Sequence, residues 1–138
     1  FAGIITPDFS TYVDFPLPLK LWNTYRMRAF GYWYGVICGG QVINNVRWGT
    51  AETYRYCFDG IPKNSIIAIG TVGGSPRKLT DRERFEEGLK ELVKVLSPRV
   101  IIVYGSADYP CFDELRAQGI EIIAFPSKTS KVFAGRAK

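Results

Sequence analysis

Polar side chains close several apolar runs in this sequence, and Arg47 is the one best suited to chemistry. It follows the run 42–46, and a guanidinium group can bind a phosphate or carboxylate through two parallel hydrogen bonds. The adjacent Trp48 is predicted either to stack on a base or sugar ring or to pack in the core. Arg47 has one structural alternative, an ion pair with Asp8 or Asp59.

Further candidates lie at the ends of neighbouring runs, where a parallel sheet binds its ligands. The segment 71–75 is small, contains two glycines and precedes a predicted helix, so its backbone N–H groups could contact phosphate. It matches neither a dinucleotide fingerprint nor a Walker loop, and the alternative is a plain connection. The predicted ligand-binding residues near these ends are Asp8, Asn45, Asp59, Thr71, Gly73, Gly74, Tyr104 and Ser106.

A predicted helix over residues 19–34 supplies two more ligand-binding candidates, Asn23 and Arg26. They share one helical face with Phe30. Arg26 is predicted either to reach the same crevice as Arg47 or to cover a neighbouring carboxylate. A separate stripe of this helix is predicted to pack against the sheet as core: Trp22, Tyr25, Ala29 and Trp33.

The residue types present specify no catalytic chemistry. The chain has no histidine, which removes the usual general base at neutral pH and the commonest metal ligand. Cys38, Cys57 and Cys111 form no metal-binding or redox spacing, and we predict reduced thiols in a cytoplasmic protein. Asp8 and Asp59 are a weak candidate pair for acid–base or magnesium chemistry. We therefore predict no metal site and assign neither a catalytic residue nor a cofactor.

Five short apolar runs must position these side chains: 2–6, 42–46, 65–69, 100–104 and 120–125. The last three are nearly continuous in β-branched residues, as is typical of strands buried on both faces. Helices are predicted between the runs, over residues 19–34, 50–57, 80–96 and 112–118. This alternation predicts an α/β fold, a mostly parallel five-stranded βαβ sheet with helices on both faces. The alternative is a partial barrel completed by absent upstream sequence.

The predicted helix over residues 80–96 has the clearest local signals. Thr80 and Glu83 form a capping box, which places Thr80 at the N-cap. Pro98 prevents the helix from continuing. Apolar side chains recur between these points as one stripe, formed by Phe85, Leu89, Leu92, Val93 and Leu96.

Length and charge predict a single domain with a basic tail. The 138 residues are divided into a domain over 1–126 and a tail over 127–138. The net charge is +5, and the tail holds basic residues and no acid, so it is predicted either to contact nucleic acid or to be solvated. No apolar run approaches the ~18 residues of a membrane helix, so no membrane partner is predicted. A start at Phe1, beside a predicted strand, predicts that upstream sequence is missing.

Five sequence blocks together resemble a family of bacteria, phages and mobile elements that is defined only as a domain of unknown function, number forty-four seventeen. The blocks are 6–10, 22–26, 45–49, 57–61 and 101–105. The resemblance spans about residues 6–125 and implies a longer protein, with sequence before the Pro-Asp-Phe-Ser block, but no activity. Related sequences often carry a histidine and a cysteine where this chain has residues 72–75, so no metal or redox role is implied there.

Three functions stand as alternatives. The first is binding of an anionic small molecule, such as a nucleotide or a phosphate- or carboxylate-bearing metabolite, by Arg47 and Arg26. The second is a nucleic-acid-associated accessory role, through the basic tail and the arginines and lysine at positions 77, 78, 82 and 84. The third is a structural or protein-interaction module, with Tyr109, Phe112 and residues 32–34 at an interface. The oligomeric state is not predicted.

Overall fold

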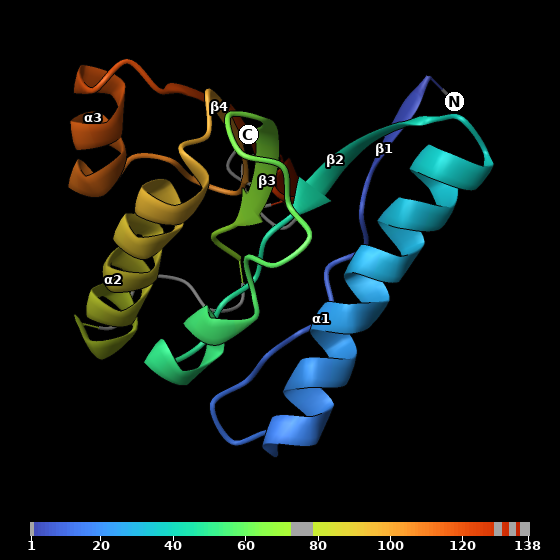
Figure 1. The fold of residues 1–138 in the computed structure, drawn as a ribbon. Coiled ribbons are helices and arrows are strands. Elements are labelled where there is room, and N and C mark those ends of the chain that lie inside the picture. The colour runs from blue at the N-terminus through green and yellow to red at the C-terminus, as the bar shows by residue number, and fades with distance from the viewer. Residues whose placement is uncertain (1, 73–78, 129–130, 133–134, 136–138) are drawn as a thin grey trace.

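A computed structural model describes residues 2–72, 79–128, 131, 132 and 135 of the chain. Strands and helices alternate along it (Figure 1). The strands are β1 (Gly3–Ile5), β2 (Gln41–Asn45), β3 (Ile66–Gly70), β4 (Val100–Tyr104) and β5 (Glu121–Phe125). The α-helices are α1 (Leu17–Tyr32), α2 (Leu79–Leu96) and α3 (Pro110–Ala117), and the shorter helical segments are the π-helical η1 (Trp33–Ile37) and the 3-10 helix η2 (Ala51–Arg55).

The five strands form one open parallel sheet in the order β1-β2-β3-β4-β5. The central β3–β4 pairing extends over five residues of each strand, from Ile66↔Val100 to Gly70↔Tyr104. The edge strand β1 has only three residues. These findings confirm the predicted α/β class with a five-stranded parallel sheet, and the sheet is not closed into a barrel.

The helices lie on one face of the sheet, which differs from the predicted arrangement on both faces. On α1, a Cβ at Gly31 would meet the side chains of Val42 and Asn44 at 3.4 Å. Asn44 is in register with Ile67, which belongs to the core that α2 covers. The strand order explains the difference, because right-handed crossovers in an order that never reverses all return on the same side. The sequence does not reveal that order.

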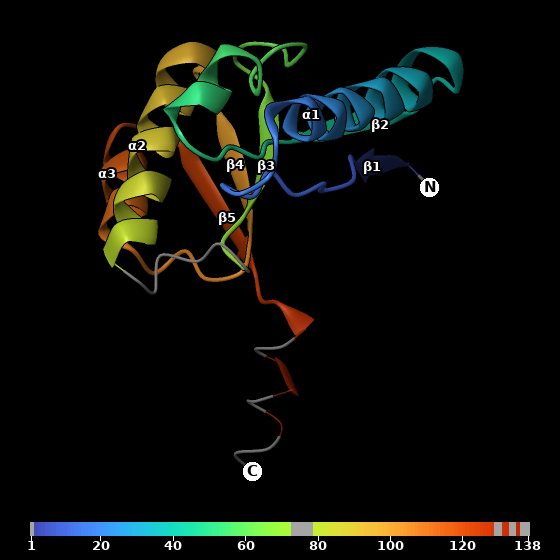
Figure 2. The same ribbon diagram turned by 90° about the horizontal axis from the view of Figure 1, so that it is seen from below.

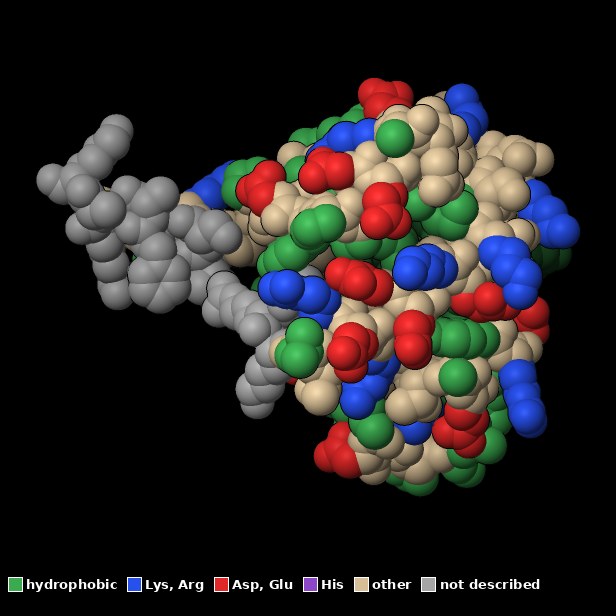
Figure 3. Space-filling model, turned by 90° about the vertical axis from the view of Figure 1, so that its left-hand side faces the viewer, with side chains coloured by type: hydrophobic (Ala, Val, Ile, Leu, Met, Phe, Trp, Pro, Cys, Tyr) green, Lys and Arg blue, Asp and Glu red, His purple; other side chains and the backbone are tan. Residues whose placement is uncertain are grey.

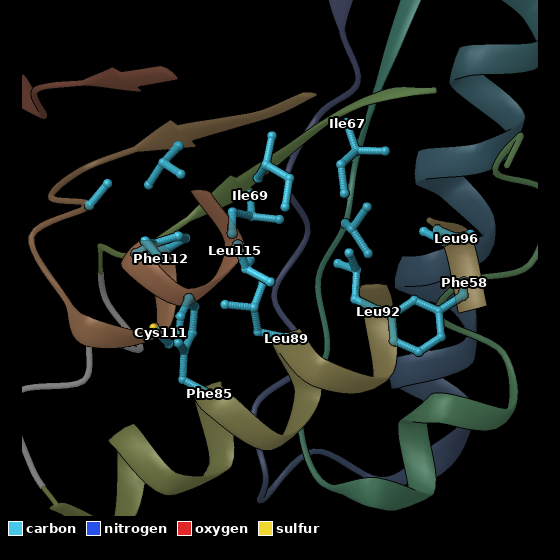
Figure 4. Close-up of a cluster of buried hydrophobic side chains, with 14 of the residues drawn as sticks. Phe58, Ile67, Ile69, Phe85, Leu89, Leu92, Leu96, Cys111, Phe112 and Leu115 are labelled. Carbon is cyan, nitrogen blue, oxygen red and sulfur yellow. The ribbon is translucent and has the colours of Figure 1, made fainter. Parts of the chain in front are cut away.

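The core lies between the sheet and helices α2 and α3 (Figure 4). The predicted apolar stripe of α2 is buried there through Phe85, Leu89, Leu92 and Leu96. These side chains pack with residues of β3, β4 and α3, including Phe112, which is completely buried. The full burial of Phe112 corrects the prediction that it lies at an interface.

The opposite face of the sheet is here called the open face. None of the helices α1, α2 and α3 covers it (Figure 2). Its side chains alternate with those of the core along each strand. Ile5, Tyr104, Ile123 and Phe125 are all more than a third exposed there. Their continuous apolar pattern predicted that the runs 65–69, 100–104 and 120–125 are buried on both faces. The exposed side chains show that this is not so along their whole length.

Helix α1 presents to the sheet the side opposite to the one predicted. Its buried residues are Lys20, Asn23, Thr24, Met27 and Gly31. The stripe predicted as core faces outward instead, with Trp22 53%, Tyr25 62% and Trp33 49% exposed. The reason is that α1 covers the loop after β1, whose backbone carbonyls need hydrogen-bond donors. Polar side chains of α1 supply these donors, so this side of the helix is buried.

The helix boundaries also differ in detail from the predictions. Thr80 is not an N-cap, because α2 begins one residue earlier, at Leu79. The predicted helix over 50–57 is a short 3-10 helix. Helix α3 ends as predicted before Gly119, which adopts a positive φ of 89° that glycine tolerates best. Within the described part of the chain, no helix is long and apolar enough to cross a membrane.

Candidate functional site

A pocket of about 210 Å³ opens at the carboxyl ends of β2 and β3. Four segments line it: the loop 10–13 after β1, residues 46–49 after β2, Gly70 at the end of β3, and Asp81, Arg84 and Phe85 from the first turns of α2. This is the edge where parallel sheets bind ligands, and three of its four segments are loops or strand ends that the sheet holds in place. Of the predicted site residues, Arg47 and Trp48 line this pocket.

Arg47 lines the pocket and is held by Asp8. Its Nε and one terminal nitrogen donate to the two carboxylate oxygens at 3.0 and 2.8 Å, in a bidentate pair. The Arg47 side chain is 22% exposed and that of Asp8 is 38% exposed. Of the two alternatives for Arg47, the structural pair with Asp8 is therefore present, and it fixes the guanidinium group at the pocket wall.

The loop after β1 is held in position by α1. Asn23 donates from its amide nitrogen to the Ser10 carbonyl at 2.7 Å, and its amide oxygen accepts from Arg26 at 2.6 Å. The Arg26 guanidinium also lies 3.8 Å from the centre of the Phe9 ring. Lys20 donates to the Val13 carbonyl at 3.2 Å. Asn23 and Arg26 thus position the pocket loop, and neither lines the pocket.

An aromatic wall closes the pocket on the core side. The Trp48 ring lies 5.3 Å from the Phe85 ring, and both residues line the pocket. Trp48 also packs so closely on α2 that a Cβ at Gly88 would overlap its indole. Trp48 therefore packs against the core, as one of its two predictions has it, and also presents part of its ring to the pocket.

Two further polar groups at the pocket lie outside the predicted set. Thr11 is only 4% exposed, and its hydroxyl is buried without a hydrogen-bond partner. Arg84 pairs with Asp81 at 3.6 Å, and both side chains are more than a third exposed. The sequence offered a weak signal for Arg84, its position in the first turns of the helix after β3. It offered none for Thr11, whose burial depends on the loop conformation.

Other predicted residues lie near the same edge without lining this pocket. The Thr71 hydroxyl donates to the carbonyl of Ser106 at 2.9 Å and so joins the ends of β3 and β4. The Ser106 hydroxyl donates to Asp108 at 3.2 Å. The phenol oxygen of Tyr104 accepts from the Lys128 backbone at 3.3 Å. The predicted glycines Gly73 and Gly74 lie outside the described residues.

Asn45 and Asp59 contribute to a structural centre around Arg28, which was not predicted. The guanidinium group of Arg28 donates to the carbonyls of Asn45, Cys57 and Asp59 at 3.1, 2.7 and 2.9 Å. Burial lowers the pKa of Arg28 from 12.5 to about 10. Asp8 faces Arg47, whereas Asp59 belongs to this second centre. The carboxylates of Asp8 and Asp59 make no contact with each other, so the structure does not support the hypothesis that they act as a pair.

The cysteines and carboxylates of the described segments offer little for redox or metal chemistry. Cys38 is exposed, whereas Cys57 and Cys111 are buried, and all three are free thiols. Burial raises the pKa of Cys57 from 9.0 to about 12, and burial also raises the pKa of Cys111. The residues that the structure describes contain no cluster of three or more cysteines and carboxylates arranged to hold a metal ion.

The outer surface over α2 and α3 mixes acidic and basic side chains (Figure 3). Ion pairs three residues apart occur on both helices, between Arg84 and Asp81 and between Arg116 and Asp113. Two of the residues proposed for nucleic-acid contact, at positions 77 and 78, lie outside the described residues. Among the residues that the structure describes, the basic side chains of this face alternate with acidic ones and form no continuous patch of the kind that binds phosphate backbones.

An open parallel sheet with a pocket at its carboxyl edge defines a small α/β domain. The chain belongs to the family described as Domain of unknown function (DUF4417), which matches residues 1–126. A similar protein is the Gene 1 protein of Mycobacterium phage L5, 41% identical over 105 residues, which are 75% of this chain and 44% of the relative. The Gene 1 protein of Mycobacterium phage D29 is 39% identical over 109 residues, 78% of this chain and 39% of that relative.

These comparisons confirm the resemblance drawn from the sequence blocks and the association with phages. The chain spans about two fifths of the length of the curated relatives that it matches. No solved structure matches it.

Proposed function

We propose that this domain binds a small molecule carrying a phosphate or carboxylate group in the pocket at the carboxyl ends of β2 and β3. The observation that carries the proposal is the joint lining of that pocket by two guanidinium groups, those of Arg47 and Arg84. Guanidinium groups bind phosphate and carboxylate oxygens with matched geometry. Arg47 is pre-positioned by Asp8, which limits the loss of side-chain entropy on binding.

Arg84 is the side chain best placed to exchange its ion pair within the protein for an ion pair with the ligand. Its pair with Asp81 is long at 3.6 Å, and both side chains are more than a third exposed, so the pair contributes little to stability. Exchanging Asp81 for a ligand anion therefore has a small energetic cost. Arg47 keeps its bidentate partner and supplies positive potential together with its remaining donor capacity.

The Thr11 hydroxyl supports a polar ligand independently of charge. A buried hydroxyl without a partner loses the hydrogen bonds that water would give it, and folded proteins usually avoid this. Thr11 lines the pocket, and a rotation of its side chain towards the cavity would let this hydroxyl, which is sealed from solvent in the structure, donate to a ligand oxygen. The aromatic wall of Trp48 and Phe85 favours an apolar or ring-shaped portion beside the anion.

The volume limits the size of the ligand. At about 210 Å³ the pocket is smaller than the roughly 300–1,000 Å³ of sites for drug-sized molecules. A small acid, a sugar phosphate or one end of a mononucleotide fits this class better than a dinucleotide does.

The test is a thermal-shift and calorimetric comparison of three proteins: the unaltered chain, Arg84→Ala and Arg116→Ala. Arg116 is a matched control, because it forms the same kind of ion pair with Asp113 on α3, outside the pocket. The probes are inorganic phosphate, pyrophosphate, a sugar phosphate, a nucleoside monophosphate and citrate. A ligand at 100-fold excess over its Kd should add about 2.7 kcal/mol to the stability.

We expect at least one probe to bind the chain and Arg116→Ala equally. Its affinity for Arg84→Ala should fall about tenfold or more, as expected for the loss of a charged hydrogen bond. Absence of binding by every probe to a folded chain would refute the proposal, and so would equal binding to all three proteins.

A further inference from the structure

The outward face of α1 and η1 carries an uninterrupted row of apolar side chains. We call it the aromatic stripe and define it as Trp22, Tyr25, Ala29, Tyr32, Trp33 and Val36. The spacing of three and four residues puts these side chains on one side of the helix, opposite Met27 and Gly31, which face the sheet. Within the stripe, the rings of Trp22 and Tyr25 stack with their centres 5.7 Å apart.

The stripe is well exposed. Trp22 is 53% exposed, Tyr25 62%, Tyr32 65% and Trp33 49%. With aromatic side chains of roughly 200 Å² each, these four alone leave about 450 Å² of mainly apolar surface in water. Val36, at 61%, extends the patch along η1. The largest apolar patch on a typical monomer is about 300–600 Å² and is often functional, so a patch of this size is a candidate binding surface.

Charge distinguishes this face from the rest of the surface. No charged residue occurs between positions 29 and 46, whereas the face over α2 and α3 mixes acidic and basic side chains (Figure 3). Arg26 borders the stripe, where its guanidinium lies 5.9 Å from the centre of the Trp22 ring, and it also donates to Asn23 and lies over the Phe9 ring. The inner side of α1 buries the polar residues Lys20, Asn23 and Thr24, so its apolar stripe is the side turned to solvent.

We propose that the aromatic stripe binds the same stripe of a second copy of this chain across a two-fold axis. A two-fold interface brings identical patches together, so a patch with charges of one sign would repel itself. This patch has none, and its rings can stack on or interleave with their equivalents. The four aromatic side chains alone supply more than half of the about 800 Å² that each partner contributes to a stable interface of standard size.

The test is sedimentation equilibrium of the chain, Tyr25→Glu and Leu79→Glu over about 1–100 μM. Tyr25 lies near the middle of the stripe, and in a two-fold dimer the substitution would bury two like charges without partners. Leu79 is the matched control: it is 69% exposed, lies at the start of α2 and does not belong to the stripe. Circular dichroism of each protein checks that it is folded.

We expect the unaltered chain and Leu79→Glu to approach twice the 15.5 kDa mass of one chain at the higher concentrations. Tyr25→Glu should remain monomeric, with a dimer Kd raised about 100-fold or more and an unchanged circular dichroism spectrum. A folded chain that is monomeric at 100 μM would overturn the proposal and point to a different occupant, such as another segment of a longer polypeptide. Dimerisation that Tyr25→Glu leaves unchanged would overturn it as well.

Discussion

At the scale of single residues, two arginines do different work: Arg47 follows strand β2, whereas Arg28 lies on helix α1. Arg47 is held by a carboxylate, and the pair remains partly solvated at the pocket. Arg28 is held by three backbone carbonyls, which joins α1 to the end of β2 and to the segment after η2. The first arrangement leaves an arginine beside a cavity, whereas the second satisfies three backbone carbonyl groups.

Arg28→Ala should lower the free energy of unfolding by about 2–4 kcal/mol, because three carbonyls lose a charged donor. Arg28→Lys should restore only part of the loss, since one ammonium group cannot reach all three carbonyls with the geometry of a guanidinium. Urea denaturation followed by circular dichroism measures the change. Arg116→Ala, which breaks an exposed ion pair, should cost less than about 1 kcal/mol. Equal losses for Arg28→Ala and Arg116→Ala would contradict the structural role of Arg28.

The buried thiol of Cys57 gives stability a specific pH dependence. Its pKa is about 12 in the folded chain and near 9.0 when exposed. Because the folded-state pKa is raised, the contribution is complete below pH 9 and is lost as the pH rises from 9 towards 12, where only the unfolded chain ionises. The free energy of unfolding should fall over this range by up to about 1.4 kcal/mol per pH unit from this group.

Cys57→Ala should remove that component of the slope, whereas Cys38→Ala should keep it, because Cys38 is exposed. Urea titrations at pH 8, 9.5 and 10.5 provide the comparison. A slope that is identical in Cys57→Ala and in the unaltered chain would show that the thiol is not protected by burial.

At the scale of elements, the sequence predicts the buried side of a helix correctly where apolar packing alone decides which side that is. Helix α2 buries the stripe that its periodicity predicts, because it packs on an apolar sheet face. Helix α1 buries Lys20, Asn23 and Thr24, because it also covers a loop whose carbonyls need donors. Apolar periodicity alone therefore selects the wrong side of α1.

The candidate site was predictable to a similar degree. Arg47, Trp48 and Asp8 meet at the carboxyl edge because they directly follow strands, and strand ends can be recognised from apolar runs. Thr11 and Arg84 reach the same pocket only through the path of a loop and the starting point of α2. Neither is encoded in a local pattern, so both require the three-dimensional structure.

The contact between α2 and the segment after β2 depends on a missing side chain at Gly88. Gly88→Ala should destabilise the fold, although alanine favours a helix by about 1 kcal/mol, because the new Cβ would overlap the Trp48 indole. In a Trp48→Ala background the same substitution should become neutral or stabilising. Thermal denaturation of the four proteins of this double-mutant cycle measures the coupling. Additive effects would show that the two residues do not touch.

At the scale of the whole molecule, the order of strands explains both the site and the uncovered surfaces. Because the order never reverses, the crossovers through α1, α2 and α3 all return on one face, the core forms there, and none of these three helices covers the open face. The loops that follow β1 and β2 consequently meet the end of β3 and the first turns of α2 at one edge, where they line the pocket. The family match over residues 1–126 includes every element of this arrangement.

The most direct test of the proposed anion site is a titration of the chain with pyrophosphate, followed by amide nitrogen–proton NMR spectra. The account predicts that the largest shifts fall on residues 10–13, 47–49 and 81–85, which line the pocket. Thr11→Val should weaken the effect, whereas Thr24→Val should not, although both hydroxyls are buried without a partner. Absence of shifts at the pocket, or shifts concentrated in the basic residues after position 127, would contradict the account.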